Sequence, residues 1–322
     1  MTSALVAVDP SPFVTLQDAG RFGWQRFGVS RSGAMDIAAL TRANGLVGNP
    51  SRSACLEFAH SAGSWVVDAI SCRIAVTGGS FAVFVDEAKV PFNTSVALTR
   101  GQTLRIGGAA DAVWGYVAVA GGFDLPAVLG SLSTHVRSAI GPFGRPLRAA
   151  DVLPLKRDWV RVEAERTVSG GIAARPPRLR VVLGPQDDYF APATLERFCD
   201  GVFAVTHNMD RLGYHLTGPK LSPPAVNMIS DGLVPGCIQV VGSGDPIVLM
   251  RDAQPPGGYP KIATLVSADI GWLAQSRPGT PVRFEPVSVQ AAQALRGEFL
   301  AGLGGSVTHV MARPAIRRAA AV

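Results

Sequence analysis

The sequence of 322 residues lacks the features of several large protein classes. Its four cysteines are scattered and form no C-x-x-C pair, which argues for reduced thiols in a cytoplasmic protein. No apolar run reaches the length of a membrane span, because glycine, aspartate and proline interrupt the nearest one, at 113–130. The first residues have neither the basic segment nor the long apolar segment of an export signal. We therefore expect a cytoplasmic protein without a membrane span.

Charge is also sparse, at 17% of residues, and hydrophobic residues make up 47%, which describes a compact globular chain. The net charge of +6 comes mostly from arginines dispersed along the sequence. A nucleic-acid binder shows basic clusters interleaved with exposed aromatic residues, and this pattern is missing. The basic balance indicates solubility and a mild attraction for anionic substrates.

Familiar catalytic motifs are absent. The sequence contains no G-x-x-x-x-G-K-[ST] phosphate loop, no G-x-S-x-G nucleophile elbow and no Ser-x-x-Lys arrangement. His207 and His215 lie close together, but their spacing fits no common zinc pattern and no cysteine pair accompanies them. We expect no metal site.

Glycine and proline are abundant instead, with 36 and 24 residues, and they separate many short apolar runs. Three helices are expected: Ala34–Val47 capped by Ser32, Pro192–Phe198, and Val289–Leu300 capped by Ser288. The expected strands are Ser64–Val67, Arg73–Thr77, Ala82–Val85, Thr103–Ile106, Val113–Val119, Arg178–Leu183, Cys237–Val241, Pro246–Met250 and Pro281–Phe284. The fold class is therefore mainly β with a few helices (α+β).

The polar, breaker-rich stretch Lys156–Pro177 is the best linker in the sequence. It divides the chain into an N-terminal β-rich lobe with one early helix (1–165), a C-terminal lobe (178–302) and a tail (303–322). The similarity of "RGQTLRIGG" (100–108) to "RPGTPVRFEP" (277–286) weakly favours two related β-rich lobes.

Four polar stretches combine glycines with acidic, amide and arginine side chains: 16–36, 184–190, 207–216 and 230–261. Glycines allow a backbone to approach a ligand, and successive N–H groups can hold an anion. Each stretch also has a structural interpretation as a capped loop, an Asx turn, a surface ion pair or a buried amide. Taken singly, none identifies a site.

Together, the stretches resemble a known family. "QDAGRFGWQRFGVSRSGAMD", "CLEFAHSAG", "YVAVAGGFDLPAVLGSLST", "LGPQDDYF", "DRLGYHLTGP", "SDGLVPGCIQV" and "GGYPKIATLVSADIGWLAQSRPG" occur in the order found in the biotin-dependent carboxyltransferase family. The similar branch contains KipA-type proteins, allophanate hydrolase subunit 2 and the C-type subunit of bacterial 5-oxoprolinase. This resemblance implies lobes with cyclophilin-like barrel character.

The loop 251–263, "RDAQPPGGYPKIA", carries the most specific part of the resemblance. Family members more often read Asp-x-Gln-Thr-x-Gly-Gly-Tyr-Pro here, so Pro255 replaces the usual threonine and removes both a hydroxyl and an N–H group. The site residues expected as catalytic are Asp252, Gln254, Tyr259 and Asp210. Those expected to bind substrate are Arg211, Asp231, Gln239, Gly257, Gly258, Lys261, Gln17, Asp18 and Arg21.

The resemblance implies a subunit of an ATP-dependent 5-oxoprolinase, inactive alone, which opens the lactam of 5-oxo-L-proline to give L-glutamate. The expected partners are a KipI-type subunit and a LamB/YcsF-type subunit. One alternative is carboxyl transfer from carboxybiotin to urea or a related amide, with biotin on another chain because no biotin attachment motif occurs here. The other alternative is a non-catalytic regulatory partner of a KipI-type protein.

Overall fold

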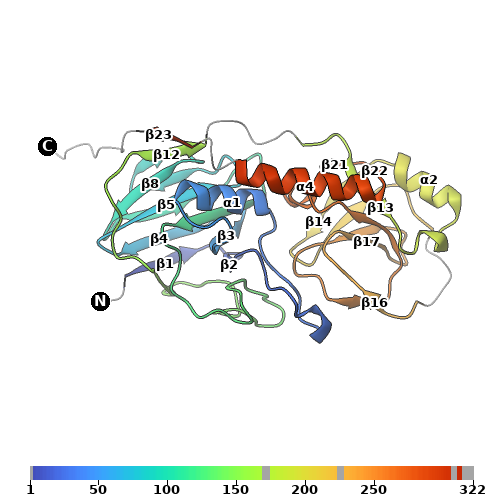
Figure 1. Ribbon diagram of the computed structural model, residues 1–322, viewed down its shortest axis with the longest axis horizontal. Helices are drawn as coiled ribbons and strands as arrows, with labels where there is room; N and C mark the ends of the chain where they lie inside the picture. The colour runs from blue at the N-terminus through green and yellow to red at the C-terminus, as the bar shows by residue number, and fades with distance from the viewer. Residues whose placement is uncertain (1–2, 169–174, 223–227, 306–309, 314–322) are drawn as a thin grey trace. The chain divides into compact units, whose positions relative to one another are not determined.

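A computed structural model describes residues 3–168, 175–222, 228–305 and 310–313 (Figure 1). The chain forms two compact units. The first comprises Met1–Gly20, Asp36–Ile172 and Leu303–Val322, and the second comprises Arg21–Met35 and Ala173–Gly302. The second unit thus includes a short segment from near the N-terminus. No helix among the described residues is long and apolar enough to cross a membrane.

The first unit is built on two antiparallel sheets. In order across the six-stranded sheet, the strands are β11 (Val152–Pro154), β1 (Ala4–Pro10), β4 (Gly63–Asp68), β9 (Thr103–Ile106), β6 (Val83–Val85) and β7 (Ala88–Val90). The five-stranded sheet runs β2 (Thr15–Gln17), β3 (Cys55–Ala59), β10 (Trp114–Val119), β5 (Ser71–Thr77) and β8 (Ser95–Thr99). One hydrophobic cluster contains Leu5 and Trp65 of the larger sheet with Leu56 and Val117 of the smaller, so the two sheets share a core.

Helix α1 (Ile37–Leu46) covers the smaller sheet. It contacts β10 and β5, and the hydroxyl of Thr77 donates to the carbonyl of Ala39 at 2.8 Å. Every residue of β10 is buried, as expected of a strand with the core on one face and a helix on the other. A two-stranded ladder of β12 (Glu165–Val168) and β23 (Val310–Arg313) completes this unit.

The cap of α1 differs from the prediction. Asp36, not Ser32, precedes the first helical residue, and its Oδ1 accepts the N–H groups of Ala38 (3.0 Å) and Ala39 (3.1 Å). A carboxylate satisfies two N–H groups that a helix start leaves open, and it also suits the positive end of the helix dipole. Ser32 instead adopts a left-handed backbone conformation, with φ of 53°, so the predicted start at Ala34 was wrong.

The second unit is a barrel-like sheet of eight strands. The order is β21 (Pro281–Val282), β14 (Phe203–Met209), β15 (Gly213–Thr217), β18 (Pro246–Leu249), β17 (Cys237–Val240), β20 (Lys261–Leu265), β13 (Leu179–Leu183) and β22 (Phe284–Pro286). The two edge strands, β21 and β22, are separated in sequence only by Arg283. Opposite edges of the sheet are therefore joined by one residue, which requires the sheet to roll up until it nearly closes.

The second unit also contains the short elements η1 (Gln25–Phe27), η2 (Asp187–Tyr189), α2 (Pro192–Asp200), α3 (Ile270–Ala274) and the pair β16 (Asp231–Gly232) and β19 (Pro256–Gly257). The longer helix α4 (Val289–Gly305) follows β22 in sequence. The rings of Phe198 in α2 and Phe284 in β22 stack at 4.7 Å, so α2 packs against the edge of the barrel. The Tyr214 hydroxyl donates to the carbonyl of Ala274 at 2.7 Å and fixes the end of α3.

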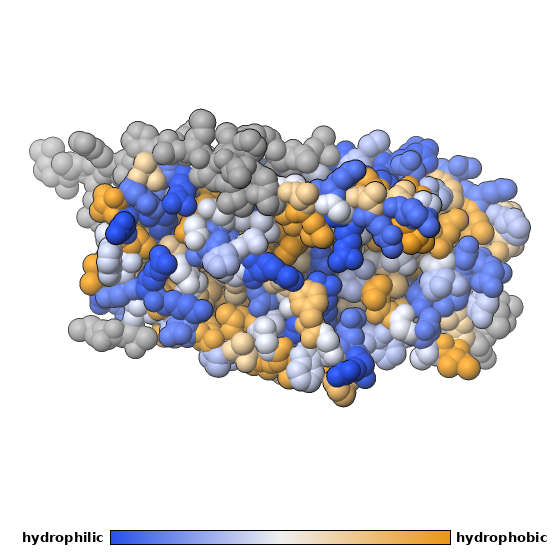
Figure 2. Space-filling view, in the orientation of Figure 1, coloured by the Kyte–Doolittle hydropathy of each residue, from blue (hydrophilic) through white to orange (hydrophobic). Residues whose placement is uncertain are grey.

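The predicted fold class, mainly β with a few helices and a barrel-like lobe, is confirmed. The predicted strand Pro281–Phe284 is in fact two strands, because the chain switches barrel edges at Arg283. Part of the predicted linker forms β12 and pairs with β23. Within the predicted tail, residues 303–305 extend α4 and 310–313 form β23, whereas the remainder lies outside the described residues. On the face in Figure 2, apolar and hydrophilic residues are interspersed.

Candidate functional site

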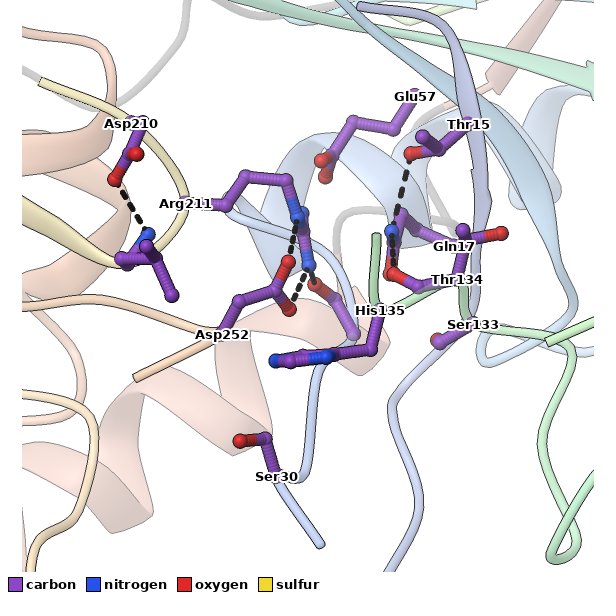
Figure 3. A network of polar contacts seen from close by, with 12 residues as sticks. Thr15, Gln17, Ser30, Glu57, Ser133, Thr134, His135, Asp210, Arg211 and Asp252 are labelled. Atoms are coloured by element: carbon purple, nitrogen blue, oxygen red, sulfur yellow. Dashed lines mark hydrogen bonds and ion pairs between the residues drawn. The ribbon is translucent and has the colours of Figure 1, made fainter. Parts of the chain in front are cut away.

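The second unit holds a buried ion pair between two of the predicted site residues. Arg211, in the turn from β14 to β15, donates from Nε to Oδ2 of Asp252 and from Nη2 to Oδ1, both at 2.8 Å (Figure 3). Only 11% of the Arg211 side chain and 6% of the Asp252 side chain are exposed. Nη2 also donates to the carbonyl of Gly33 at 2.9 Å, so the pair anchors the segment 21–35 to the barrel of the same unit.

Asp210 is turned toward its own backbone. Its Oδ1 accepts the N–H groups of Leu212 (2.7 Å) and Gly213 (3.1 Å), an Asx turn that shapes the connection carrying Arg211 (Figure 3). In addition, the backbone N–H group of Asp252 donates to the backbone carbonyl of Arg211 at 2.7 Å. The orientation of Arg211 is therefore set by both the turn and the strand end.

A second polar group surrounds Lys261 at the start of β20. The Lys261 ammonium, 3% exposed, donates to Oδ2 of Asp231 at 2.5 Å and to the carbonyl of Gly232 at 2.9 Å. Gln186 bridges the same two residues: its Nε2 donates to Asp231 Oδ2 at 3.0 Å and its Oε1 accepts the Lys261 N–H at 3.0 Å. A buried ammonium is thus matched by an acceptor set that includes one carboxylate.

These contacts change the acidity of Asp231. The hydrogen bond from Lys261, followed by the Gly232 N–H and the Gln186 amide, lowers the pKa of the Asp231 carboxyl to about 2. About half of the Asp231 side chain is exposed, so this carboxylate is ionised and open to solvent at neutral pH. It can accept a hydrogen bond from a ligand N–H group while Lys261 holds it in place.

The glycines of the loop 251–263 lie against this second group. Gly257 in β19 pairs with Asp231 in β16, and a Cβ atom added at Gly257 would lie 2.5 Å from Cδ1 of Leu233. The buried amide of Gln239 donates to the carbonyl of Tyr259 at 3.1 Å. The structure therefore brings Asp231, Gln239, Gly257 and Lys261 together with the backbone of the loop.

Two loop side chains remain toward solvent. Gln254 is exposed and makes no hydrogen bond within the part of the chain that the structure describes. Tyr259 is 53% exposed, with its backbone carbonyl held by Gln239. Because the loop begins at the Arg211–Asp252 pair and ends at the Lys261 group, both of these side chains project from a segment fixed at each end. An amide can donate and accept at once, so Gln254 suits a planar amide ligand.

The N-terminal residues divide between the units. Gln17 and Asp18 belong to the first unit and Arg21 to the second. Gln17 is buried and its Nε2 donates to Thr15 Oγ1 (3.0 Å) and to the carbonyl of Thr134 (2.8 Å), as Figure 3 shows. The Asp18 carboxylate accepts hydrogen bonds of 2.6–2.8 Å from the Gly20 N–H group and from residues 131–133. The shortest, at 2.6 Å, comes from the Ser133 hydroxyl. These contacts fix the loop 131–135.

Sequence reasoning missed a buried acidic group in the first unit. The Tyr116 hydroxyl donates to Oε2 of Glu57 at 2.8 Å and accepts the N–H of Asp36 at 2.7 Å. Burial, then the nearby carboxylates of Glu57 and Asp36, raises the pKa of the Tyr116 phenol well above its usual range. The sequence signal for this buried group was Glu57, a charged residue inside the otherwise apolar strand "CLEFA". Gln186 was likewise not predicted as a site residue, although it lies in the polar stretch 184–190.

Among the described residues, no group of three or more histidine, cysteine, aspartate or glutamate side chains is arranged to hold a metal ion.

Comparison with known proteins gives consistent matches. A family model, the carboxyltransferase domain, subdomain A and B, matches residues 27–286. The C-type subunit of 5-oxoprolinase from Haemophilus influenzae is 37% identical over 90% of this chain and 93% of that protein. The urea amidolyase of Saccharomyces cerevisiae is 30% identical over 89% of this chain but only 17% of that protein. The crystal structure of Kluyveromyces lactis urea carboxylase aligns with a TM-score of 0.84 and 25% identity, over 98% of this chain and 31% of that chain.

Proposed function

The chain belongs to the carboxyltransferase domain family with subdomains A and B, and we propose that it serves as a subunit of an ATP-dependent 5-oxoprolinase. One observation carries this proposal: the match to the C-type 5-oxoprolinase subunit extends over nine-tenths of both chains. The urea amidolyase match covers a small part of a much longer protein. The match therefore covers nearly the whole of a subunit in the first case and one segment of a longer protein in the second.

The reaction opens the lactam of 5-oxo-L-proline. The C–N bond of the ring breaks, one water adds to the carbonyl carbon, and the nitrogen becomes the ammonium group of glutamate, while a second water and ATP give ADP and phosphate. A site for this substrate needs an acceptor for the lactam N–H and donors for the carbonyl. Gln254 offers both functions, and the exposed, ionised Asp231 offers the acceptor.

The other residues take supporting roles in the proposal. Lys261 and Gln186 hold Asp231, and the N–H group of Gly258 serves as a donor to the substrate. Gly257 remains a substrate-binding candidate through its close-packed backbone, which pairs with Asp231 of β16. Tyr259, half exposed on the same loop, provides a hydroxyl for proton transfer or binding. Asp252 acts with Arg211 as a buried pair that sets the start of the loop, and Asp210 shapes the turn that carries Arg211. Gln17, Asp18 and Arg21 remain substrate-binding candidates.

The proposed partners are a KipI-type subunit and a LamB/YcsF-type subunit, because the similar proteins are themselves named as subunits. ATP is used by the assembled complex in this proposal, and no residue of this chain is assigned to it.

Carboxyl transfer from carboxybiotin to urea or a related amide is the second candidate, supported by the alignment with urea carboxylase over 98% of this chain. Biotin would then be carried by another chain. A planar amide would occupy the same group of residues in both cases. A purely regulatory partner of a KipI-type protein is the third possibility, and the activity test distinguishes it.

The test is ATP-dependent release of glutamate from 5-oxo-L-proline, measured with this chain alone and with the chain co-purified with both partner subunits. We expect glutamate only from the full mixture. A stable, correctly assembled complex that releases none would overturn the proposal. The same complex, supplied with a biotin carboxylase, carboxylated carrier and urea, would then test carboxyl transfer.

A further inference from the structure

A cavity of about 640 Å³ lies in the first unit, and none of the residues that line it belongs to the candidate site. Its lining comes from the end of α1 (Val47 and Gly48), from Arg73 in β5, from Ala120 after β10, and from the segment 156–166. This volume falls within the range of about 300–1,000 Å³ that small-molecule pockets occupy. The segment 156–166 forms most of the wall, although its composition had suggested only a linker.

Hydrogen bonds from the buried Arg73 side chain hold that wall in place. Arg73, 4% exposed, donates to Glu165 Oε2 at 3.1 Å and to Glu163 Oε1 at 2.9 Å, and its Nη2 also reaches the carbonyls of Arg161 and Glu163. Glu165 in turn accepts the Ser95 hydroxyl at 2.6 Å and the Ala97 N–H at 2.9 Å. The positive charge of Arg73 is therefore paired with carboxylates of the protein itself. The segment 156–166 is fixed to β5 and β8 before any ligand binds.

Arg166 is also occupied. Its Nη2 lies 3.7 Å from Oε1 of Glu163, and a Cβ atom added at Gly48 would lie 3.3 Å from its Nη1. Gly48, with φ of 73°, is the second residue after α1, close to the end where the helix carbonyls carry partial negative charge. The guanidinium of Arg166 thus offsets the negative end of α1 at this wall of the pocket.

Three cations remain for a ligand. Lys156, Arg157 and Arg161 are exposed, and none has a side-chain hydrogen bond or ion pair within the part of the chain that the structure describes. Nearby, Asp158 accepts the N–H of Ile70 at 3.2 Å through Oδ1. The stem of Arg157 is positioned, because a Cβ atom at Gly121 would meet its Cγ at 2.8 Å. Among the lining residues, five cationic side chains (Arg73, Lys156, Arg157, Arg161 and Arg166) outnumber two carboxylates, those of Asp158 and the partly exposed Glu163, so the pocket is positive.

The same pocket has apolar surface. Trp159 lines it with 58% of its surface exposed, and Val47, Ala120 and Val160 contribute aliphatic groups. An inorganic anion would leave this surface and most of the volume unused. A flat ring can stack on an indole or a guanidinium plane, and phosphate oxygens match the donors of arginine and lysine.

We propose that this pocket binds a phosphorylated compound that carries a flat ring, the ligand class that nucleotides represent. The proposal does not depend on the proposed function, since it is tested by ligand binding to this chain alone, without partner subunits. The segment 156–166 supplies the cations and the indole, and the Arg73–Glu163–Glu165 contacts hold it in place.

Titration calorimetry of the full chain at low salt tests this, with ATP, AMP, adenosine and pyrophosphate as separate ligands. We expect both nucleotides to bind more tightly than adenosine or pyrophosphate. The double substitution Arg157→Gln/Arg161→Gln should weaken ATP binding at least 10-fold, and Trp159→Ala should weaken ATP but not pyrophosphate. The matched control is Arg283→Gln/Arg296→Gln, which removes the same charge from exposed positions in the second unit and should change affinity less than 2-fold.

Three results would overturn the proposal. The first is no detectable binding of either nucleotide at millimolar concentration. The second is equal weakening by the pocket pair and the control pair, which would mean only a general attraction of anions to a basic protein. The third is pyrophosphate binding as tightly as ATP with no effect of Trp159→Ala, which would remove the ring from the proposed ligand. Circular dichroism of each variant shows that its fold is retained.

Discussion

Arg211 and Asp252 are joined by two parallel hydrogen bonds of 2.8 Å, from Nε and Nη2 of the guanidinium to both carboxylate oxygens. The two residues are distant in sequence, yet each begins or ends a segment that shapes the candidate site. Arg211 lies in the turn shaped by Asp210, and Asp252 starts the loop that ends at Lys261. The pair therefore connects the position of the loop to the barrel.

Removing one member of this pair should destabilise the second unit strongly. Asp252→Ala leaves a largely buried guanidinium without its carboxylate, a change that costs about 3–5 kcal/mol in other proteins. Urea unfolding followed by circular dichroism measures the loss. Asp245→Ala is the control, because its partner Lys220 is 63% exposed and such a surface pair contributes about 0–1 kcal/mol. Equal losses for the two variants would show that burial of the Arg211–Asp252 pair has no energetic consequence.

Asp231 should remain ionised to unusually low pH. Its folded-state pKa of about 2 lies below the ordinary value of 3.8, so its contribution to stability is complete above about pH 5 and is lost as pH falls through 3.8 and then 2. The stability difference between the wild type and Asp231→Asn should therefore be constant near neutral pH and shrink between about pH 5 and pH 2. Unfolding curves at a series of pH values measure it. A difference that already shrinks at about pH 6, or that persists unchanged down to pH 2, would contradict the assigned interaction with Lys261.

Gln254 should affect catalysis without affecting stability. The side chain is exposed, so Gln254→Ala removes little from the fold. If its amide binds the lactam, kcat/KM of the assembled complex should fall about 10-fold, the equivalent of one hydrogen bond of about 1.4 kcal/mol. Gln290→Ala, at an exposed position of α4, is the matched control and should leave kcat/KM unchanged. An unchanged kcat/KM for Gln254→Ala removes this residue from the site.

The cap of α1 offers a direct comparison between the predicted and observed helix starts. Asp36→Ala should cost about 1 kcal/mol of stability, because it removes the acceptor for two N–H groups. Ser32→Gly should cost nothing and can stabilise, since φ of 53° suits glycine better than serine. Thermal unfolding measures both. A larger loss for Ser32→Gly than for Asp36→Ala would restore Ser32 as the important residue at this helix start.

Local sequence signals predicted the elements whose causes are local. Ser288 does accept the N–H of Ala291 at the start of α4, at 3.1 Å, and Pro192 opens α2 as expected. The predicted cap of α1 was wrong because Asp36, about one turn beyond Ser32, is the residue that precedes the helix. Only the fold shows that Asp36 is fixed by Tyr116 of a distant strand.

The candidate site likewise combines features that the local sequence predicts with contacts that only the fold reveals. The loop 251–263 was recognisable from its glycines and polar residues, but its attachment to Gln186 and Asp231 depends on contacts between segments far apart in sequence. Arg211 and Asp252 were selected as separate groups, and their pairing with each other could not be read from spacing alone. Asp18 likewise reads as a free carboxylate, although residues 131–133 occupy both of its oxygens.

The hydroxyl of Tyr116 should contribute more to stability than the equally buried hydroxyl of Tyr214. Tyr116 donates to the Glu57 carboxylate and accepts the Asp36 N–H, whereas Tyr214 donates to one neutral carbonyl, that of Ala274. Phenylalanine keeps each ring in place, so the substitutions compare the hydroxyls. Tyr214→Phe should cost about 1 kcal/mol, and Tyr116→Phe roughly 2–3 kcal/mol, because a hydrogen bond to a charged group is stronger and a buried carboxylate loses a donor. Urea unfolding at neutral pH, where the raised pKa keeps Tyr116 protonated, measures both losses. Equal losses would mean that Glu57 is satisfied without Tyr116, and that the link from β3 through β10 to the start of α1 does not depend on this hydroxyl.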